Sequence, residues 1–413
     1  MGRLAAAGLA AVLATVCAGP GLANDFIRIG AIYPLTGSSA QAGRDAQAAI
    51  EVGEDIIGRP HNGLDATPLA GQNLPNLGGG QIQVIFADHQ ENASVAQSQA
   101  LYLIGQSKVV ALIGGGDWPS MRAATVAAEH HGIPFLVPDA TEPQITGRGF
   151  AWVFRTTPLS GDVMRTYLQF FEGLKAAGSK IERIAVVSGN DARGISQAQR
   201  LSEAARTAGF TVDPLAYKPN SIDVTAAVTL LRQKSPDAAI LDCDAADASL
   251  FIKTMKTLDY RPPILIGDGE GFSDPGFVAA DGNLAQGLID RSVWSPGEPG
   301  SPTAIVNGLF KAKTGHDLDD ASARVLQGFL VLAEAINRAG STEPAAIQKA
   351  LRETDLRPDQ LIVGYNGVKF DASGQNILAA TYLTQLQGKQ YVTVWPAERA
   401  AGKLVLPYKA WVP

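Results

Sequence analysis

Residues 109–120 read Val-Val-Ala-Leu-Ile-Gly-Gly-Gly-Asp-Trp-Pro-Ser, and this stretch decides the fold that we expect. A short apolar run rich in β-branched residues is typical of a strand buried on both faces. A helical, Ala-rich segment follows it, and a second apolar run, 133–137, ends at Pro138-Asp139-Ala140-Thr141. Two strands joined by one helix run parallel, so their carboxyl ends meet at one edge of a sheet. Open α/β sheets bind ligands at that edge.

Both strand-end loops are suited to contact a ligand. Glycines allow close approach to the backbone, and a helix N-terminus behind a loop offers free N–H groups. A Gly-Gly-Gly turn by itself is more often only a tight connection. Two successive loops, one with Trp118 and the other with Thr141, favour the ligand-binding interpretation. The predicted contacts in this half of the molecule are Tyr33, Gly116, Asp117, Trp118, Ala140 and Thr141.

Composition narrows the class of protein. The net charge of −6 and the lack of a basic stripe argue against a nucleic-acid partner. Residues 1–23 have the pattern of a secretory signal peptide, with Arg3, an apolar core and small residues before the expected cleavage point. Removal of this segment would leave Cys243 as the one cysteine, so no intrachain disulfide is expected. No later apolar run reaches the ~18–20 residues of a membrane span. We therefore expect an exported, soluble protein.

Alternation of strands and helices predicts two doubly wound, Rossmann-like α/β lobes with a ligand cleft between them. The first alternation covers about 26–155 and the second about 160–267. Apolar positions from Val325 to Ile336 predict a long helix packed on a sheet, and we expect 302–360 to return to lobe one. The predicted units are 24–157 plus 294–365 for lobe one, 158–293 plus 366–396 for lobe two, and a tail, 397–413. Three crossovers are expected near 156–159, 291–297 and 364–369. Residues 59–80 are interpreted as a surface insertion, with a hairpin or a lid as alternatives.

Catalytic and metal-binding motifs are missing from the sequence. It has no nucleophile elbow, no phosphate-binding lysine loop, and no histidines at metal-ligand spacing. Acids after the lobe-two strands are normally helix N-caps, and we interpret Asp191, Asp242 and Asp268 in this way. Three further residues are better candidates for ligand contacts: Arg193, Asp244 and Glu270. Asp244 and Glu270 leave open an exported hydrolase with paired carboxylates.

Several motifs in a fixed order carry a resemblance to a known family: I-R-I-G-A-I-Y-P-L-T-G, F-A-D, L-I-G-G-G-D-W-P-S, G-I-P-F-L-V-P-D-A-T-E-P-Q-I-T and F-R-T-T-P. Together they resemble the type I periplasmic solute-binding proteins of ABC importers, in particular the leucine/isoleucine/valine-binding proteins and their relatives for amides and aromatic acids. The resemblance covers 26–396. It implies the two-lobed periplasmic binding protein fold, hinge closure on a small carboxylate-bearing solute, and delivery to ABC permease subunits of the inner membrane.

The resemblance also implies roles for single residues. Ala140-Thr141 match the family's Ala-Thr that holds a ligand carboxylate, and Glu270 matches its acid for an α-ammonium group. Trp118 stands where the family has a serine, and Arg193 where it has a tyrosine, so a larger, flatter or more acidic ligand than leucine is expected. The implied protein is a periplasmic monomer without catalytic activity, cofactor or metal. A ligand-sensing subunit of a receptor, which shares this fold, remains an alternative.

Overall fold

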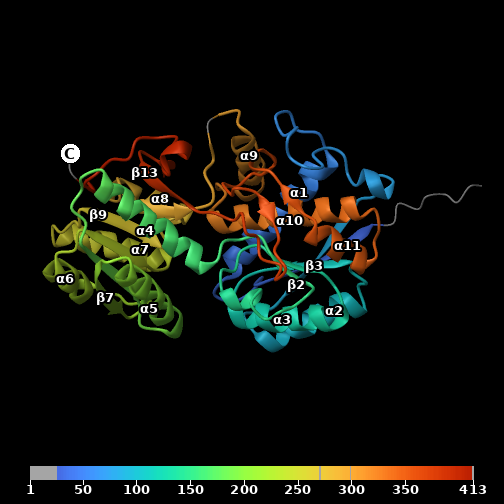
Figure 1. Cartoon of the computed structure of the whole chain (residues 1–413), viewed down its shortest axis with the longest axis horizontal. Helices are drawn as coiled ribbons and strands as arrows, with labels where there is room; N and C mark the ends of the chain where they lie inside the picture. Colours follow the sequence, from blue (N-terminus) through green and yellow to red (C-terminus); the bar gives the residue numbers. More distant parts are fainter. Residues whose placement is uncertain (1–25, 269–270, 298, 412–413) are drawn as a thin grey trace, which may run out of the picture.

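Two separate β-sheets divide the chain into two lobes, which lie side by side in Figure 1. The computed structural model describes residues 26–268, 271–297 and 299–411. The sheet of lobe one has five strands in the order β2-β1-β3-β4-β5, and the sheet of lobe two has seven in the order β14-β13-β10-β9-β8-β6-β7. The predicted fold class of two doubly wound α/β lobes is confirmed.

In the five-stranded sheet of lobe one every strand pair is parallel, so the loops after the strands gather at one edge. β3 lies between β1 and β4, with Gly114 beside Ile32 and Ile113 beside Leu136. The loops after these three strands are therefore neighbours, as the sequence predicts. The strands are β1 (Ile27–Tyr33), β2 (Ile82–Asp88), β3 (Ala111–Gly114), β4 (Phe135–Val137) and β5 (Val153–Arg155).

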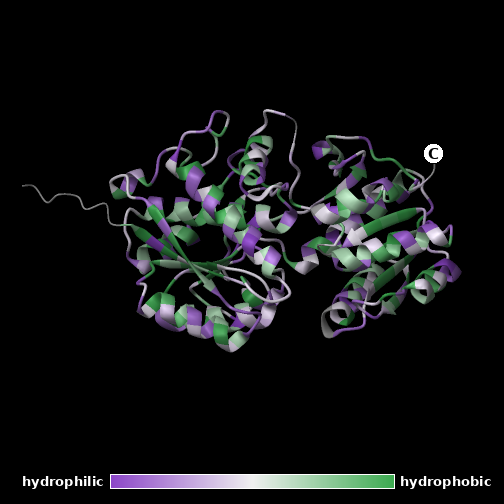
Figure 2. Ribbon diagram, turned by 180° about the vertical axis from the view of Figure 1, so that it is seen from behind, coloured by the Kyte–Doolittle hydropathy of each residue, from purple (hydrophilic) through white to green (hydrophobic). Residues whose placement is uncertain are grey.

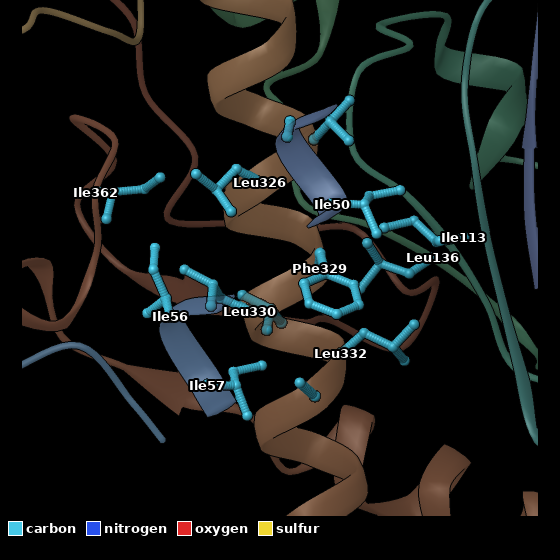
Figure 3. Close-up of a cluster of buried hydrophobic side chains, with 14 of the residues drawn as sticks. Ile50, Ile56, Ile57, Ile113, Leu136, Leu326, Phe329, Leu330, Leu332 and Ile362 are labelled. Carbon is cyan, nitrogen blue, oxygen red and sulfur yellow. The ribbon is translucent and has the colours of Figure 1, made fainter. Parts of the chain in front are cut away.

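Helices cover both faces of this sheet. The long helix α10 (Asp320–Ala339) packs on one face, and its side chains meet those of α1 in Figure 3. Gly53 of α1 allows this contact, because a Cβ there would overlap the ring of Phe329. The predicted return of the long helix to lobe one is confirmed. The same face carries α1 (Ala40–Gly58), α9 (Pro302–Thr314) and α11 (Pro344–Arg352), and the other carries α2 (Ala93–Gly105) and α3 (Trp118–His131).

Lobe two repeats this layering. Figure 2 shows hydrophobic strands inside each lobe and helices of mixed hydropathy around them. Its strands are β6 (Arg183–Gly189), β7 (Thr211–Tyr217), β8 (Ala238–Asp242), β9 (Ile264–Asp268), β10 (Ile289–Ser292), β13 (Tyr382–Gln387) and β14 (Gln390–Trp395). One face carries α4 (Ser160–Ala176) and α5 (Ala192–Thr207), and the other α6 (Thr225–Lys234), α7 (Ala245–Thr257) and α8 (Pro275–Asp281).

Three connections join the lobes, and the third lies later in the chain than expected. The first two run from β5 to α4 and from β10 to α9. Strand β12 (Val368–Lys369) still pairs with β11 (Asp355–Leu356) beside lobe one, and Gln375 bridges to Arg155. The third crossover therefore follows Asn376, and its predicted position at 364–369 is wrong. We propose that lobe one extends from 24–157 and 294–365 to include 366–376.

Two other segments differ from their predicted character. The insertion 59–80 forms turns and a short 3-10 helix, η1 (Pro75–Leu77), anchored by the fully buried Leu64 and Leu74, and no hairpin strands occur there. The end of the chain packs on lobe two, where Tyr408 is buried and its N–H donates to Pro263 O at 2.8 Å. Within the described ranges no helix is long and apolar enough to cross a membrane. The predicted signal peptide, 1–23, lies outside the described residues.

Candidate functional site

The loops after β3 and β4 are packed against each other at the edge of lobe one. A Cβ on Gly115 would overlap the carboxylate of Asp139, so any larger residue here would have to displace that side chain. Gly116 has a φ of 101°, a conformation that side chains rarely adopt, and a Cβ there would lie 2.9 Å from His89 Nε2. Two of the three glycines are thus explained by close contacts between neighbouring loops.

His89 holds the loop that contains Gly114, Gly115 and Gly116 in place. It is completely buried, its Nδ1 accepts from Glu91 N–H at 3.1 Å, and its Nε2 lies 3.1 Å from Gly115 O. Acceptance at Nδ1 places the proton on Nε2, which donates to the Gly115 carbonyl. His89 is therefore a structural brace that sequence reasoning missed. Among the described residues no group of three or more histidines, cysteines or acids could hold a metal ion.

Free backbone donors line both loops. The N–H groups of Gly116, Asp117 and Trp118 donate to no other described residue, and neither do those of Ala140 and Thr141. Asp117 is the N-cap of α3, because its Oδ1 accepts from Ser120 N–H at 2.9 Å. Its side chain thus serves the helix, while the N–H groups beside it stay available to an anionic or polar ligand.

Trp118 is partly occupied within its own lobe. It is half-buried, and the guanidinium of Arg148 lies 5.4 Å from its ring centroid. Arg148 is itself fixed by hydrogen bonds, among them one of 2.7 Å to Thr125 Oγ1, and burial lowers its pKa. This cation–π contact was not predicted, since nothing local to Arg148 indicates the partner. Trp118 stays a predicted ligand contact with one face committed to the protein.

Arg155 holds the loop after β4 in place. This fully buried side chain donates to Glu142 O at 2.5 Å, to Ala140 O at 3.4 Å and to Thr146 Oγ1 at 3.1 Å. Its Nε donates to Gln375 Oε1 at 2.7 Å. Burial lowers the pKa of Arg155 to about 10, so it remains a cation at neutral pH. Arg155 therefore sets the path of the loop that carries Thr141.

Tyr33 ends β1 next to these loops. It is 1% exposed, and its hydroxyl has no hydrogen-bond partner among the described residues. Burial and, second, the charge of Asp139 raise its pKa well above the ordinary value, so the hydroxyl keeps its proton. Tyr33 is brought to the same edge as the two loops, but it lies inside the core of lobe one.

In lobe two the structure brings together some of the predicted residues. Asp191 caps α5 by accepting from Gly194 N–H at 2.8 Å, as predicted. Asp244 is exposed at the N-cap position of α7, and Gly271 packs on its backbone, because a Cβ on Gly271 would overlap Cys243 O. The loops after β8 and β9 are therefore adjacent. Glu270 and the side chain of Arg193 lie outside the described residues.

Asp268 is no helix cap, contrary to the prediction. It is buried and accepts from Tyr167 Oη at 2.8 Å, Gln197 Nε2 at 2.7 Å and Arg291 Nε at 3.2 Å. Burial opposes its ionisation, but Arg291 and these hydrogen bonds hold its pKa below the ordinary value. Because Arg291 comes from β10, this cluster could not be read from the residues next to Asp268.

A cavity of about 740 Å³ lies between the lobes beside the second crossover. Lobe two contributes residues of α8, β10 and the β13–β14 turn, and lobe one contributes the ends of α9 and α10. Asp290, 1% exposed, lines the cavity, and its Oδ1 has no hydrogen-bond partner in the described part of the chain. Burial raises the pKa of Asp290 well above its ordinary value. The lobes are thus incompletely packed at this point.

The chain is similar to a known protein family over most of its length. Residues 27–390 match the model of a family described as periplasmic binding protein. The Leu/Ile/Val-binding protein homolog 8 of Brucella abortus is 27% identical over 395 residues, which cover 92% of each chain.

Two solved structures share the fold. A branched-chain amino acid ABC transporter periplasmic ligand-binding protein from Burkholderia xenovorans aligns with a TM-score of 0.73 and 15% identity, covering 89% of this chain and 94% of its own. A solute-binding protein of an ABC transporter from Rhodopseudomonas palustris, in complex with 3,4-dihydroxybenzoic acid, aligns with a TM-score of 0.72 and 19% identity, covering 90% and 96%.

Proposed function

Because the chain belongs to the periplasmic binding protein family, we propose that it captures a small carboxylate-bearing solute between its lobes and delivers it to an ABC permease. The solute class is an amino acid or a related organic or aromatic acid. The names of the Brucella and Rhodopseudomonas proteins, one for branched-chain amino acids and one for an aromatic acid, support this range.

The observation that carries the proposal is the double set of free N–H groups in lobe one. Those of Gly116–Trp118 and of Ala140–Thr141 lie on neighbouring loops, next to a helix N-terminus. Such donors favour a carboxylate and form charge-assisted hydrogen bonds with it. The Thr141 hydroxyl and the phenol of Tyr33 are the side-chain donors that we propose beside these N–H groups.

Lobe two is proposed to complete the site when the lobes close. Asp244 and Glu270 would accept from an α-ammonium group, and Arg193 would pair with a second anionic group in a ligand that lacks an amine. We further propose that 1–23 direct export and that the protein works as a monomer in the periplasm with inner-membrane permease subunits as partners. Metals, cofactors and nucleic acids have no place in this proposal.

A thermal-shift screen over amino acids, amides and aromatic acids tests the ligand class, since a ligand that binds only the folded state raises the melting temperature. Calorimetric titration of three variants then tests the site. For an α-amino acid, Glu270→Ala removes the principal proposed partner of the ammonium group and should cost about 2–5 kcal/mol of binding free energy. Thr141→Ala removes one charge-assisted bond and should cost about 1.5–3 kcal/mol.

For a ligand without an amine, Arg193→Ala should be the costly lobe-two substitution and Glu270→Ala should change little. Unchanged affinity in both variants would show that the site is misplaced. The alternative of a hydrolase with Asp244 and Glu270 as paired carboxylates predicts sustained product formation, which a binding protein does not give. A sensing subunit would bind the same ligand without supporting uptake by a permease.

A further inference from the structure

A network of four buried charged side chains crosses from one lobe to the other along the second crossover. Its members are Asp268, Arg291, Asp320 and Arg324. Asp268 Oδ1 lies 3.2 Å from Arg291 Nε, and Arg291 Nη1 lies 4.0 Å from Asp320 Oδ2. Asp320 Oδ2 in turn lies 3.1 Å from Arg324 Nε. Two acids and two bases thus alternate along a path that is largely removed from water.

One end of this network contacts the candidate site, and the other end lies two residues before Glu270 in the sequence. Asp268 is the last residue of β9 and immediately precedes the predicted Glu270 loop. At the other end, Arg324 Nη1 donates to Asp139 O at 3.0 Å, directly before Ala140-Thr141, and to Thr157 Oγ1 in the first crossover at 3.4 Å. The network therefore connects the loop that carries Thr141 in lobe one with the end of β9 in lobe two.

Asp320 also fixes the crossover itself. Its Oδ1 accepts from Ser292 Oγ at 2.9 Å and from Val293 N–H at 2.6 Å, which are the last residue of β10 and the next one. The side chains of Asp320 and Arg324 are only 5% and 3% exposed. Removing one partner of such a buried set leaves an uncompensated charge, which is strongly unfavourable.

The ion pair between Arg291 and Asp320 is the longest of the three ion pairs in the network. Arg291 moves with the sheet of lobe two, and Asp320 with α10 of lobe one. Their 4.0 Å separation exceeds the 3.2 Å and 3.1 Å of the contacts within each lobe, and the interlobe cavity is lined by Asp320. The Arg291–Asp320 pair and the hydrogen bond from Ser292 Oγ to Asp320 therefore join the two lobes at one point.

We propose that Arg291 and Arg324, bridged by Asp320, are positioning residues that couple the ligand loops of the two lobes across the second crossover. The inference rests on the proposed function, because it assigns these loops to one ligand. This network of charged side chains sets the angle between the lobes. Through that angle it sets the affinity for a solute that both lobes hold.

The test uses the full-length protein with nitroxide labels on exposed helix positions, at Gln97→Cys in lobe one and Glu203→Cys in lobe two. Electron–electron double resonance gives the interlobe distance distribution without ligand. Arg291→Met and Asp320→Asn should shift or broaden this distribution, and Arg291→Lys, which keeps the charge, should restore part of it. Arg183→Met is the matched control, because Arg183 pairs with Asp213 at 2.8 Å inside lobe two.

Titration with L-leucine and with 3,4-dihydroxybenzoate supplies the affinity. For the probe that binds the unsubstituted protein, Arg291→Met and Asp320→Asn should weaken binding by roughly tenfold, with Arg183→Met unchanged. Folded variants with the original distance distribution and affinity would overturn the positioning role, and Arg291→Lys decides the matter if Arg291→Met does not fold. If neither probe binds, the proposed ligand class fails, while the distance distributions still decide the coupling.

Discussion

The strand-end loops of lobe one and lobe two differ in how they are supported. In lobe one, Gly115 packs on Asp139. A hydrogen bond from His89 holds the loop after β3, and hydrogen bonds from Arg155 hold the loop after β4. In lobe two, Asp191 and Asp244 stand exposed at the starts of helices. This difference suggests a division of work: lobe one offers a preformed set of donors, and lobe two brings its charged groups to a ligand already placed. A preformed site loses less entropy when it binds.

The largest test of this comparison removes the support under lobe one. Arg155→Met leaves the carbonyls of Ala140 and Glu142 without their buried hydrogen-bond donor. The free energy of unfolding should therefore fall by about 3 kcal/mol. Urea unfolding measures this loss, and calorimetry should show weaker ligand binding. Arg148→Met removes a similar side chain at the flank and should weaken binding less. Equal affinities of Arg155→Met and the parent protein would break the idea of a preformed lobe.

A smaller effect is expected from Gly115→Ala. The new methyl group would press on the Asp139 carboxylate and separate the two loops, with a stability loss of about 2 kcal/mol. Gly105→Ala is the control, since no atom lies within 4 Å of a Cβ at this helical position. That variant should be as stable as the parent or slightly more stable. Thermal unfolding of both proteins makes the comparison, and equal melting temperatures would contradict the tight packing of the loops.

Tyr167→Phe tests the supported part of lobe two. It removes one hydrogen bond to the charged Asp268, worth about 1.5 kcal/mol. The folded protein holds the pKa of Asp268 low, so this stabilisation is present above the unfolded pKa of about 4 and is lost as the pH falls further. The stability difference between parent and variant should therefore be greatest at neutral pH. A difference that grows on acidification would contradict this account.

The smallest effect concerns Glu54, which lies away from both sets of loops. Burial raises the pKa of Glu54 to about 7, and its Oε1 accepts from Val84 N–H at 3.2 Å. Folding is therefore disfavoured as the pH rises from the unfolded value through 7, although partial exposure weakens the effect. Glu54→Gln keeps the acceptor and should raise the melting temperature by about 2 °C at pH 8, with no gain at pH 4.

The control for that prediction is Glu203→Gln, because Glu203 is an exposed acid on α5 of the other lobe. Scanning fluorimetry at pH 4, 6 and 8 compares the two variants. Ligand affinity should stay unchanged in both. A pH-dependent gain of the same size in Glu203→Gln would remove Glu54 as the cause.

Local patterns in the sequence predicted what local physics determines. The alternating strands, the glycine loop after β3, the cap at Asp191 and the apolar face of α10 all depend on residues that are close in sequence. The supporting residues could not be predicted in this way. Arg155 meets Gln375 and Arg324 meets Asp139 only after the chain has folded, and an isolated arginine does not indicate whether it faces solvent or a distant carbonyl.

The same limit explains the misplaced third crossover and the role of Asp268. Residues 361–370 are rich in β-forming residues, yet only Val368–Lys369 form a strand, because the partner strand β11 is short. Asp268 follows a strand at a position where a helix N-cap is common, but it forms an ion pair with Arg291 of another strand instead. In both cases tertiary contacts overrode a reasonable local pattern.

The position of α10 has a consequence for the order in which the protein acquires its structure. Helix α1 packs on α10, although nearly the whole of lobe two is encoded between Gly58 and Asp320. Contacts of such high sequence separation slow folding, because a long loop must close before any of them forms. The core of lobe one thus waits for the last quarter of the chain. A fragment that ends near residue 158 should therefore show no cooperative unfolding transition and should be degraded readily by proteases, although its sequence contains all five strands of the sheet of lobe one.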